Sequence, residues 1–206
     1  MGLLKIVFNN TGKPQGTMGK MMLKGMNGGS HATLADFGMS FLSASGVNRI
    51  AELGFGGGRN IGELLKKYPH ATLDGVDHSR LSVETAKEYN KQNADRIDLR
   101  ESTIADMDLP LGRYDLATAF ETVYFWGDIR FCFGKVHDLL KSGGKFLIVN
   151  ESDGTDDTGR KFEDIIDNMK VYTEEQLVAS LKEAGFGIVE VHHHDQKPWI
   201  AILAQK

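Results

Sequence analysis

Apolar and polar positions alternate along most of the chain with two different periods. Short apolar runs occupy 47–53, 71–76, 97–104, 114–120 and 145–150, as expected of buried strands. Between most of these runs, apolar residues recur at helical spacing over 59–68, 79–90 and 128–140. Strands that alternate with helices are typical of βαβ units. The pattern therefore predicts an α/β domain whose mostly parallel sheet is covered on both faces.

The C-terminal part of the chain follows a different pattern. The run Thr173-Glu174-Glu175-Gln176 is a capping box that begins a helix, and this helix should end at Gly185. Two strands at 188–194 and 199–204 then follow each other across a very short turn. Such a turn cannot hold a crossover, so the last two strands should form an antiparallel hairpin.

The segment before the first strand is less regular. Residues 1–29 are rich in Gly, Lys and Met and suggest a flexible lead-in, while 31–43 should be a helix with Ser30 as its N-cap. Residues 1–44 are interpreted as a helical lead-in that either packs on the domain edge or forms a lid. After the fifth strand, 152–160 should be a solvated polar loop, because its acidic residues lack the spacing of a calcium loop.

Length and composition narrow the classes of protein further. The 206 residues suit a single domain over 1–206, and a net charge of −4 argues against general nucleic-acid binding. One cysteine, Cys132, excludes an intrachain disulfide framework. No apolar run approaches the ~20 residues that span a bilayer, and the N-terminus lacks a signal peptide's features. We therefore expect a cytoplasmic protein that binds neither nucleic acid nor membrane.

The most informative stretch is the glycine-rich turn after the first strand. Gly54, Gly56 and Gly58 stand at alternate positions and leave the backbone bare, either for positive φ angles or for close approach of a ligand. Glu52 precedes the turn and offers an acceptor without a positive charge. In open α/β sheets, ligands bind beyond the carboxyl ends of the strands.

Polar side chains follow the carboxyl ends of three more strands. Asp77 ends the second strand, where a carboxylate can accept hydrogen bonds from both hydroxyls of a ribose. Ser102, Thr103 and Ile104 end the third strand and suit the edge and face of an adenine. Phe120 and Glu121 end the fourth. Taken singly, each of these residues could have a purely structural role. Their occurrence at all four strand ends favours a nucleoside-containing ligand.

Two classes of cofactor, nicotinamide dinucleotides and S-adenosylmethionine, fit parts of this pattern. Nicotinamide enzymes share the acid after the second strand, but their Gly-x-Gly-x-x-Gly motif would need a glycine where Arg59 stands. S-adenosylmethionine carries an ammonium and a sulfonium and no phosphate, so an acidic residue before the turn suits it better.

Several motifs carry a family resemblance. Glu-Leu-Gly-Phe-Gly-Gly-Gly at 52–58, Gly-Val-Asp-His-Ser at 75–79 and Leu-Lys-Ser-Gly-Gly-Lys-Phe-Leu-Ile-Val-Asn at 140–150 resemble the successive motifs of class I S-adenosylmethionine-dependent methyltransferases. Leu-Pro-Leu-Gly-Arg-Tyr-Asp-Leu-Ala at 109–117 and Leu-Lys-Glu-Ala-Gly-Phe at 181–186 fit as well. The stretch 119–126 resembles small stand-alone microbial members. The resemblance covers roughly 45–206 and implies a Rossmann-like three-layer sandwich with seven strands in the order 3-2-1-4-5-7-6, the last antiparallel.

The resemblance also implies roles for residues. Glu52, Gly54 and Gly56 would lie near the amino-acid part of the cofactor, Asp77 would bind the ribose, His78 and Ser79 would flank the adenosine, and Phe120 and Glu121 would lie under the methionine. The full set of predicted cofactor-binding residues is Glu52, Gly54, Phe55, Gly56, Gly58, Asp77, His78, Ser79, Ser102, Thr103, Ile104, Phe120 and Glu121. The third strand lacks the usual Gly-Asp-Ala type triplet, so Asp106 is a second candidate for the adenine amino group.

The acceptor side carries weaker signals. Tyr124 and Trp126 belong to an aromatic cluster that could face the transferring methyl or pack the next helix, and His31 is a candidate base or lid contact. No metal is expected, because only alternate residues of 192–194 could share a site on a strand. We expect a methyltransferase acting on a small molecule, as monomer or homodimer. The alternatives are a nicotinamide-dependent oxidoreductase and a non-catalytic cofactor-binding module.

Overall fold

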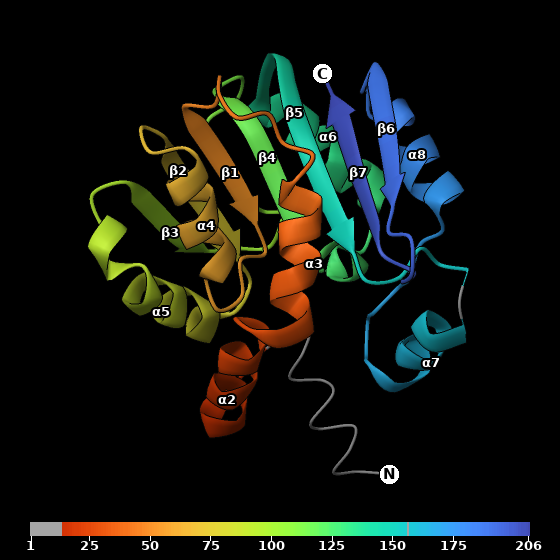
Figure 1. Ribbon diagram of the computed structural model, residues 1–206, viewed down its shortest axis with the longest axis horizontal. Coiled ribbons are helices and arrows are strands. Elements are labelled where there is room, and N and C mark those ends of the chain that lie inside the picture. Colours follow the sequence, from red (N-terminus) through yellow and green to blue (C-terminus); the bar gives the residue numbers. More distant parts are fainter. Residues whose placement is uncertain (1–13, 156) are drawn as a thin grey trace.

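The computed structural model describes residues 14–155 and 157–206, which form a three-layer α/β sandwich (Figure 1). Its seven-stranded sheet has the order β3-β2-β1-β4-β5-β7-β6, as the sequence predicts. The first five strands of the chain run parallel, and β7 pairs antiparallel with both β5 and β6. The predicted Rossmann-like architecture and the C-terminal hairpin are both confirmed.

Four strands, β1, β2, β4 and β7, lie within two residues of their predicted bounds, and most of their residues are buried. β1 spans Arg49–Leu53, β2 Thr72–Asp77 and β4 Tyr114–Phe120. β3 is shorter than predicted, because pairing with β2 ends where Asp77 meets Glu101. The remaining strands are β3 Ile97–Glu101, β5 Leu140–Asn150, β6 Ile188–His193 and β7 Ile200–Gln205.

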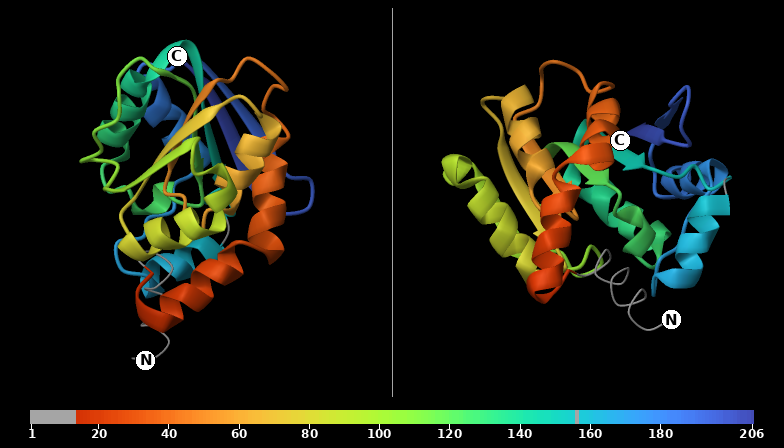
Figure 2. Two further views of the ribbon diagram at one scale, coloured as in Figure 1. Left: turned by 90° about the vertical axis from the view of Figure 1, so that its left-hand side faces the viewer. Right: turned by 60° about the horizontal axis from the view of Figure 1, so that its bottom comes forward.

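Helices cover the two faces of the sheet and enclose two apolar cores (Figure 2). One face packs against α3 Gly29–Met39, α4 Arg59–Lys67 and α5 Arg80–Tyr89, with Leu34, Ile61 and Val83 among the buried residues. The other face packs against α6 Ile129–Leu139 and α8 Glu174–Glu183 through Phe133, Val136 and Leu177. The capping box at Thr173 is present as predicted. Short 3-10 turns lie at η1 Lys91–Asn93 and η2 Val123–Phe125.

The N-terminal segment differs from its prediction. The expected flexible lead-in contains a helix, α2 Gly16–Met26, which packs on α5 and buries Leu23 completely. Tertiary packing thus outweighs the unfavourable glycines. α3 begins at Gly29 with Gly28 as its N-cap, so the prediction of Ser30 was wrong. The part of the predicted 1–44 segment at 1–13 lies outside the described residues.

The loop after β5 also differs. A helix, α7 Asp157–Ile165, stands where the sequence suggests polar loop to residue 160. β5 begins at Leu140, five positions before its predicted start at residue 145, because Leu140 already pairs with Tyr114 of β4. An irregularity in the register then precedes the regular pairing from Leu116 with Lys145. In Figure 1 α7 and α2 both lie beyond the lower edge of the sheet, where the parallel strands end.

Candidate active site

The glycine turn after β1 is held in a conformation that only glycine adopts readily. Gly54, Gly56 and Gly58 have φ of 84°, 52° and 86°, in the left-handed region. A Cβ on Gly54 would lie 2.1 Å from Oγ1 of Thr122, so the turn also presses directly on the segment after β4. The backbone N–H of Gly54 donates to the carbonyl of Val76, which ties the turn to β2.

Asn27, from the N-terminal segment, clamps the same turn. Its Nδ2 donates to the carbonyl of Gly57 at 3.0 Å, and its Oδ1 accepts from the backbone N–H of Arg59 at 3.2 Å. Gly58 has no side chain with which to cap α4, so Asn27 acts as the cap from a distant part of the chain. Sequence reasoning missed this residue, because an Asn beside glycines resembles any loop.

Asp77 organises the turn from the second strand. One carboxylate oxygen accepts from the N–H of Gly56 at 2.9 Å, and the other accepts from the N–H of Ser79 at 2.9 Å. Burial raises the pKa of Asp77, and these backbone hydrogen bonds oppose the rise. Each carboxylate oxygen has a second lone pair, so Asp77 still has acceptor capacity for a ligand.

Three hollows lie in a row along the carboxyl ends of the strands. The first, which we call the Asp77 hollow, contains Gly54 and Trp126 and is also lined by Asp77, His78, Ser102, Thr103, Ile104 and Phe125. The second, the Arg59 hollow, is lined by His31, Gly54, Phe55, Gly56, Arg59, Phe120 and Glu121, with Asn27 at its edge. The third, the Trp199 hollow, has a volume of about 270 Å³ and contains Glu121, Tyr124 and Trp199.

Most of the predicted cofactor residues therefore meet at one edge of the sheet, and three do not face the hollows. Gly58 packs against Ala86 of α5. Ser79 is buried, caps α5 by accepting from the N–H of Ser82, and donates to the carbonyl of Pro14. Glu52 is fully buried in β1, where Thr118 donates to one of its oxygens and the other has no partner.

The buried carboxyl of Glu52 has an altered acidity. Burial raises its pKa from 4.5 to about 8, against the opposing effect of the Thr118 hydrogen bond. No cation lies within reach of a hydrogen bond or ion pair to it in the contacts of the described residues. Asp106, the second candidate for adenine, instead accepts from Thr103 Oγ1 at 2.7 Å and is absent from the lining of the Asp77 hollow.

Glu121 follows β4 in a strained backbone conformation. Its φ of 59° is unusual for a residue with a side chain and is a cost that functional sites often carry. One carboxylate oxygen accepts from Tyr124 Oη at 3.1 Å and from the N–H of Glu151. Burial raises the pKa of Glu121 to about 8.

The predicted aromatic cluster is divided between two hollows. Trp126 and Phe125 line the Asp77 hollow, and the Trp126 Nε1 donates to Thr122 Oγ1 at 3.2 Å. Trp126 also stacks on Phe146 in the core. Tyr124 instead lines the Trp199 hollow, beside Glu121. His31, on α3, lines the Arg59 hollow.

The described residues contain neither a candidate metal cluster nor a helix that could span a membrane. Within 14–155 and 157–206, no cluster of three or more His, Cys, Asp and Glu side chains is arranged to hold a metal ion. Over the same residues, no helix combines the length and the apolar character that a membrane crossing needs.

Comparisons with known proteins agree with this geometry. Residues 50–144 match the family model described as a methyltransferase domain. The chain is 25% identical over 175 residues to the uncharacterised methyltransferase YdaC of Bacillus subtilis, a match that covers 84% of this chain and 90% of that protein.

Solved structures share the fold at low identity. One is a Nostoc punctiforme protein named as a proposed O-methyltransferase, with a TM-score of 0.78 and 16% identity over 99% of this chain. The chain spans 66% of that longer protein, just under two thirds. Another is the [4+2]-cyclase SpnF, with a TM-score of 0.72 and 15% identity over 86% of this chain and 81% of SpnF.

The family match covers both the glycine turn and Asp77, and the sheet has the strand order that the family resemblance implies. In fold, and in sequence over residues 50–144, the chain is thus similar to class I S-adenosylmethionine-dependent methyltransferases, the enzymes whose cofactor is S-adenosylmethionine.

Proposed function

We propose that this protein transfers the methyl group of S-adenosylmethionine to a small-molecule acceptor bound in the Trp199 hollow. The observation that supports this most is the connection between the hollows. Among the residues that line them, Gly54 alone is common to the Asp77 and Arg59 hollows, and Glu121 alone is common to the Arg59 and Trp199 hollows. A cofactor crossing Gly54 would end beside Glu121, at the opening of the third hollow.

The residues of the Arg59 hollow suit the amino-acid end of this cofactor. A zwitterion needs a cation for its carboxylate and acceptors for its ammonium. Arg59 and Glu121 line the hollow together with His31 of α3. Arg59 is largely buried and also pairs with Asp36 at 2.7 Å, which fixes its guanidinium in place.

The Asp77 hollow suits the adenosine. Asp77 lies where a carboxylate can accept from ribose hydroxyls, and Ile104, Phe125 and Trp126 supply apolar and aromatic surface for a base. Ser102 and Thr103 add polar atoms at the edge. We therefore assign the predicted residues lining this hollow to the adenosine, while Ser79 and Gly58 support the loop from behind.

When bound, the cofactor supplies a methyl group on a sulfonium, which is already activated for displacement. The chain has to bind both reactants, align them in line and exclude water. Phe120 and Phe55 form the apolar floor of the Arg59 hollow, and α2 and α3 close its open side through Asn27 and His31. In this proposal, the helical part of the 1–44 segment is the cover of the site.

The nicotinamide alternative is disfavoured because backbone N–H groups of the glycine turn already donate hydrogen bonds within the protein. A dinucleotide's pyrophosphate binds the free N–H groups at the start of the helix after the first strand. Here Gly56 N–H donates to Asp77 and Arg59 N–H donates to Asn27. Neither N–H is free for a phosphate, whereas a cofactor without phosphates does not need them.

A binding module without catalysis remains the second candidate, since SpnF shows that proteins of this fold are not all named methyltransferases. In our proposal, the protein is a soluble cytoplasmic enzyme with a small-molecule partner, as a monomer or homodimer. Neither nucleic acid nor membrane is a partner.

Calorimetry tests the cofactor assignment. The protein is titrated with S-adenosylhomocysteine and, separately, with NADH. We expect saturable binding of S-adenosylhomocysteine and none of NADH at the same concentration. Binding of NADH alone would refute the proposal. Binding of S-adenosylhomocysteine without methylation of any compound in a broad acceptor panel would favour the non-catalytic module.

A further inference from the structure

We infer that Glu121 is the general base of the reaction, and that the acceptor is a neutral, largely apolar molecule with a hydroxyl as its nucleophile. This inference rests on the proposed function and adds the chemical class of the acceptor and the group that removes its proton.

The position of Glu121 is the first argument. It is the one lining residue shared by the Arg59 hollow and the Trp199 hollow. A methyl donor on one side and an acceptor on the other would therefore meet beside its carboxylate. The left-handed φ of 59° turns this side chain into the junction at a conformational cost.

The environment of the carboxylate is the second argument. Tyr124 Oη and the N–H of Glu151 both donate to Oε1 of Glu121, and the N–H of Ser152 donates to Tyr124 Oη at 3.4 Å. These contacts fix Oε1, whereas Oε2 has no hydrogen-bond or ion-pair partner among the described residues. A base needs such a free, oriented oxygen. Burial also raises the pKa to about 8, which suits a base that acts near neutral pH.

The lining of the Trp199 hollow selects the acceptor. Its walls are mainly apolar, and its lining includes one hydrogen-bonded polar group, in which Tyr124 Oη contacts Glu121 and the N–H of Ser152. Such a hollow accepts an apolar body with one polar end. The apolar walls are Phe162, Met169, Val171, Pro198 and Trp199.

Charge excludes ionic acceptors. A cationic acceptor would be held beside the sulfonium, and an anionic one would meet Glu121 and Glu151. Lys197 also lines the hollow, but its Nζ lies over the face of the Trp199 ring, 3.8 Å from the ring centroid. The charged or titratable groups around Glu121 in the two hollows are His31, Arg59, Tyr124, Glu151 and Lys197.

The step balances without another reactant. The acceptor oxygen forms a bond to the methyl carbon as the sulfur–carbon bond breaks, and the sulfur keeps that electron pair. The acceptor's proton passes to the Glu121 carboxylate, which later releases it to solvent. Tyr124 is a positioning residue, because it touches Glu121 and not the reacting atoms.

The first experiment measures binding in the Trp199 hollow. The chain has two tryptophans, and Trp126→Phe leaves Trp199 as the only fluorophore of its kind. The variant is first saturated with sinefungin, a cofactor analogue with an amine cation in place of the sulfonium. It is then titrated with p-cresol, benzylamine and benzoate, which share one ring and differ in charge. We expect p-cresol to quench Trp199 saturably and at least about tenfold more tightly than either ion. Equal or tighter binding of benzylamine or benzoate, or no binding of p-cresol, would overturn the acceptor class.

The second experiment measures the base. Glu121→Gln keeps the shape and the hydrogen bonds to Oε1 but cannot take a proton. With cofactor and p-cresol both saturating, so that any change in their binding does not limit the rate, we expect it to methylate p-cresol at least about 100-fold more slowly than wild type. The control, Glu84→Gln, changes an exposed acid on α5 and should leave the rate unchanged. Turnover at the wild-type rate in Glu121→Gln would overturn the assignment of Glu121 as the general base.

The pH profile separates a base from a merely structural carboxylate. The wild-type rate should rise with pH to a plateau as Glu121 loses its proton, and Tyr124→Phe should move that rise to higher pH, since Tyr124's hydrogen bond lowers the pKa of Glu121. An unmoved rise in Tyr124→Phe would contradict the arrangement. Failure of S-adenosylhomocysteine to bind wild type would instead refute the proposed function itself.

Discussion

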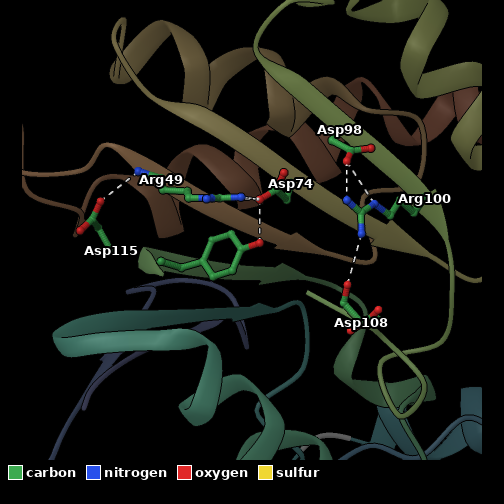
Figure 3. A network of polar contacts seen from close by, with 7 residues as sticks. Arg49, Asp74, Asp98, Arg100, Asp108 and Asp115 are labelled. Atoms are coloured by element: carbon green, nitrogen blue, oxygen red, sulfur yellow. Dashed lines mark hydrogen bonds and ion pairs between the residues drawn. The ribbon is translucent and has the colours of Figure 1, made fainter. Parts of the chain in front are cut away.

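The two ends of the same strands carry acidic side chains in opposite circumstances. At the amino ends, Arg49 donates through Nε and Nη2 to Asp74 Oδ2 at 3.1 and 2.7 Å, and Tyr114 Oη donates to the same oxygen at 2.6 Å (Figure 3). Asp115 accepts from the N–H groups of Asn48 and Arg49 and pairs with Lys141. At the carboxyl ends, Glu52 is fully buried and Glu121 is partly buried, and neither forms an ion pair among the described residues.

The pKa values of these carboxyl groups differ in the same way between the two ends of the strands. Burial would raise the pKa of Asp115, but hydrogen bonds from Lys141 and two backbone N–H groups bring it below its ordinary value. Burial raises the pKa of Glu52 and Glu121 to about 8, and the hydrogen bonds to these carboxyl groups only partly oppose the rise. One end of the sheet therefore stabilises the fold, and the other keeps unpaired polar atoms for a ligand.

We expect the largest effect on stability and cofactor binding from a substitution in the glycine turn, at the carboxyl ends of the strands. Gly54→Ala would force a side chain into Thr122 at a positive φ, so we expect loss of stability of about 3 kcal/mol and loss of S-adenosylhomocysteine binding by at least about 100-fold. Gly134→Ala is the control, because Gly134 lies in α6 with open space around its Cβ position. Urea unfolding and calorimetry would measure both. Near-wild-type binding in Gly54→Ala would contradict the tight turn.

The second effect is a pH-dependent stability at Glu52. Its pKa is about 8 in the folded state and 4.5 ordinarily, so the folded state binds the extra proton and stability falls as pH rises from about 4.5 to 8. Glu52→Gln cannot ionise. We expect it to be more stable than wild type by about 4 to 5 kcal/mol at pH 8.5, and nearly equal at pH 4.5.

Urea unfolding of both proteins across this pH range checks the prediction. A difference that grows toward acid pH would contradict the sign. A carboxyl at the amino end should behave in the opposite way, since the lowered pKa of Asp115 makes its contribution disappear as pH falls through that pKa.

The third effect is at the amino end. Arg49→Met leaves Asp74 with Tyr114 as its remaining hydrogen-bond donor, and we expect a loss of about 2 kcal/mol in stability, because Arg49 is only partly buried. S-adenosylhomocysteine affinity should not change. Arg80→Met removes an exposed i,i+4 pair on α5 and should cost under about 0.5 kcal/mol. Weakened cofactor affinity in Arg49→Met would show that the two ends are not separate in function.

The smallest effect compares two aspartates that each accept two backbone N–H groups. Asp77→Ala should weaken S-adenosylhomocysteine binding by about tenfold or more, which corresponds to about 1.4 kcal/mol. Asp115→Ala should destabilise the fold and leave the affinity of the folded protein unchanged. Equal effects of the two substitutions on affinity would refute the ribose assignment.

The sequence predicts best what depends on local pattern. The bounds of β4 at 114–120, the capping box at Thr173 and the strand-end positions of Asp77 and Glu121 all follow from apolar runs and caps. A strand that ends in a polar residue delivers that residue to the sheet edge whatever the tertiary details.

What depends on distant contacts could not be predicted. Asn27, which directly follows α2, caps α4 from a distant part of the chain. The glycines of α2 are typical of a loop, and this helix forms because it packs on α5. The aromatic residues after β4 are neighbours in sequence, but the 3-10 turn η2 directs Tyr124 and Trp126 into different hollows. The local sequence does not specify such directions, because they depend on what the turn packs against.

A crystal structure of the protein with S-adenosylhomocysteine tests the central claim most directly. The account predicts the adenine against Ile104, the amino-acid carboxylate beside Arg59, and the sulfur between Gly54 and Glu121 at the opening of the Trp199 hollow. A sulfur atom remote from Glu121, or an adenine in the Trp199 hollow, would contradict it.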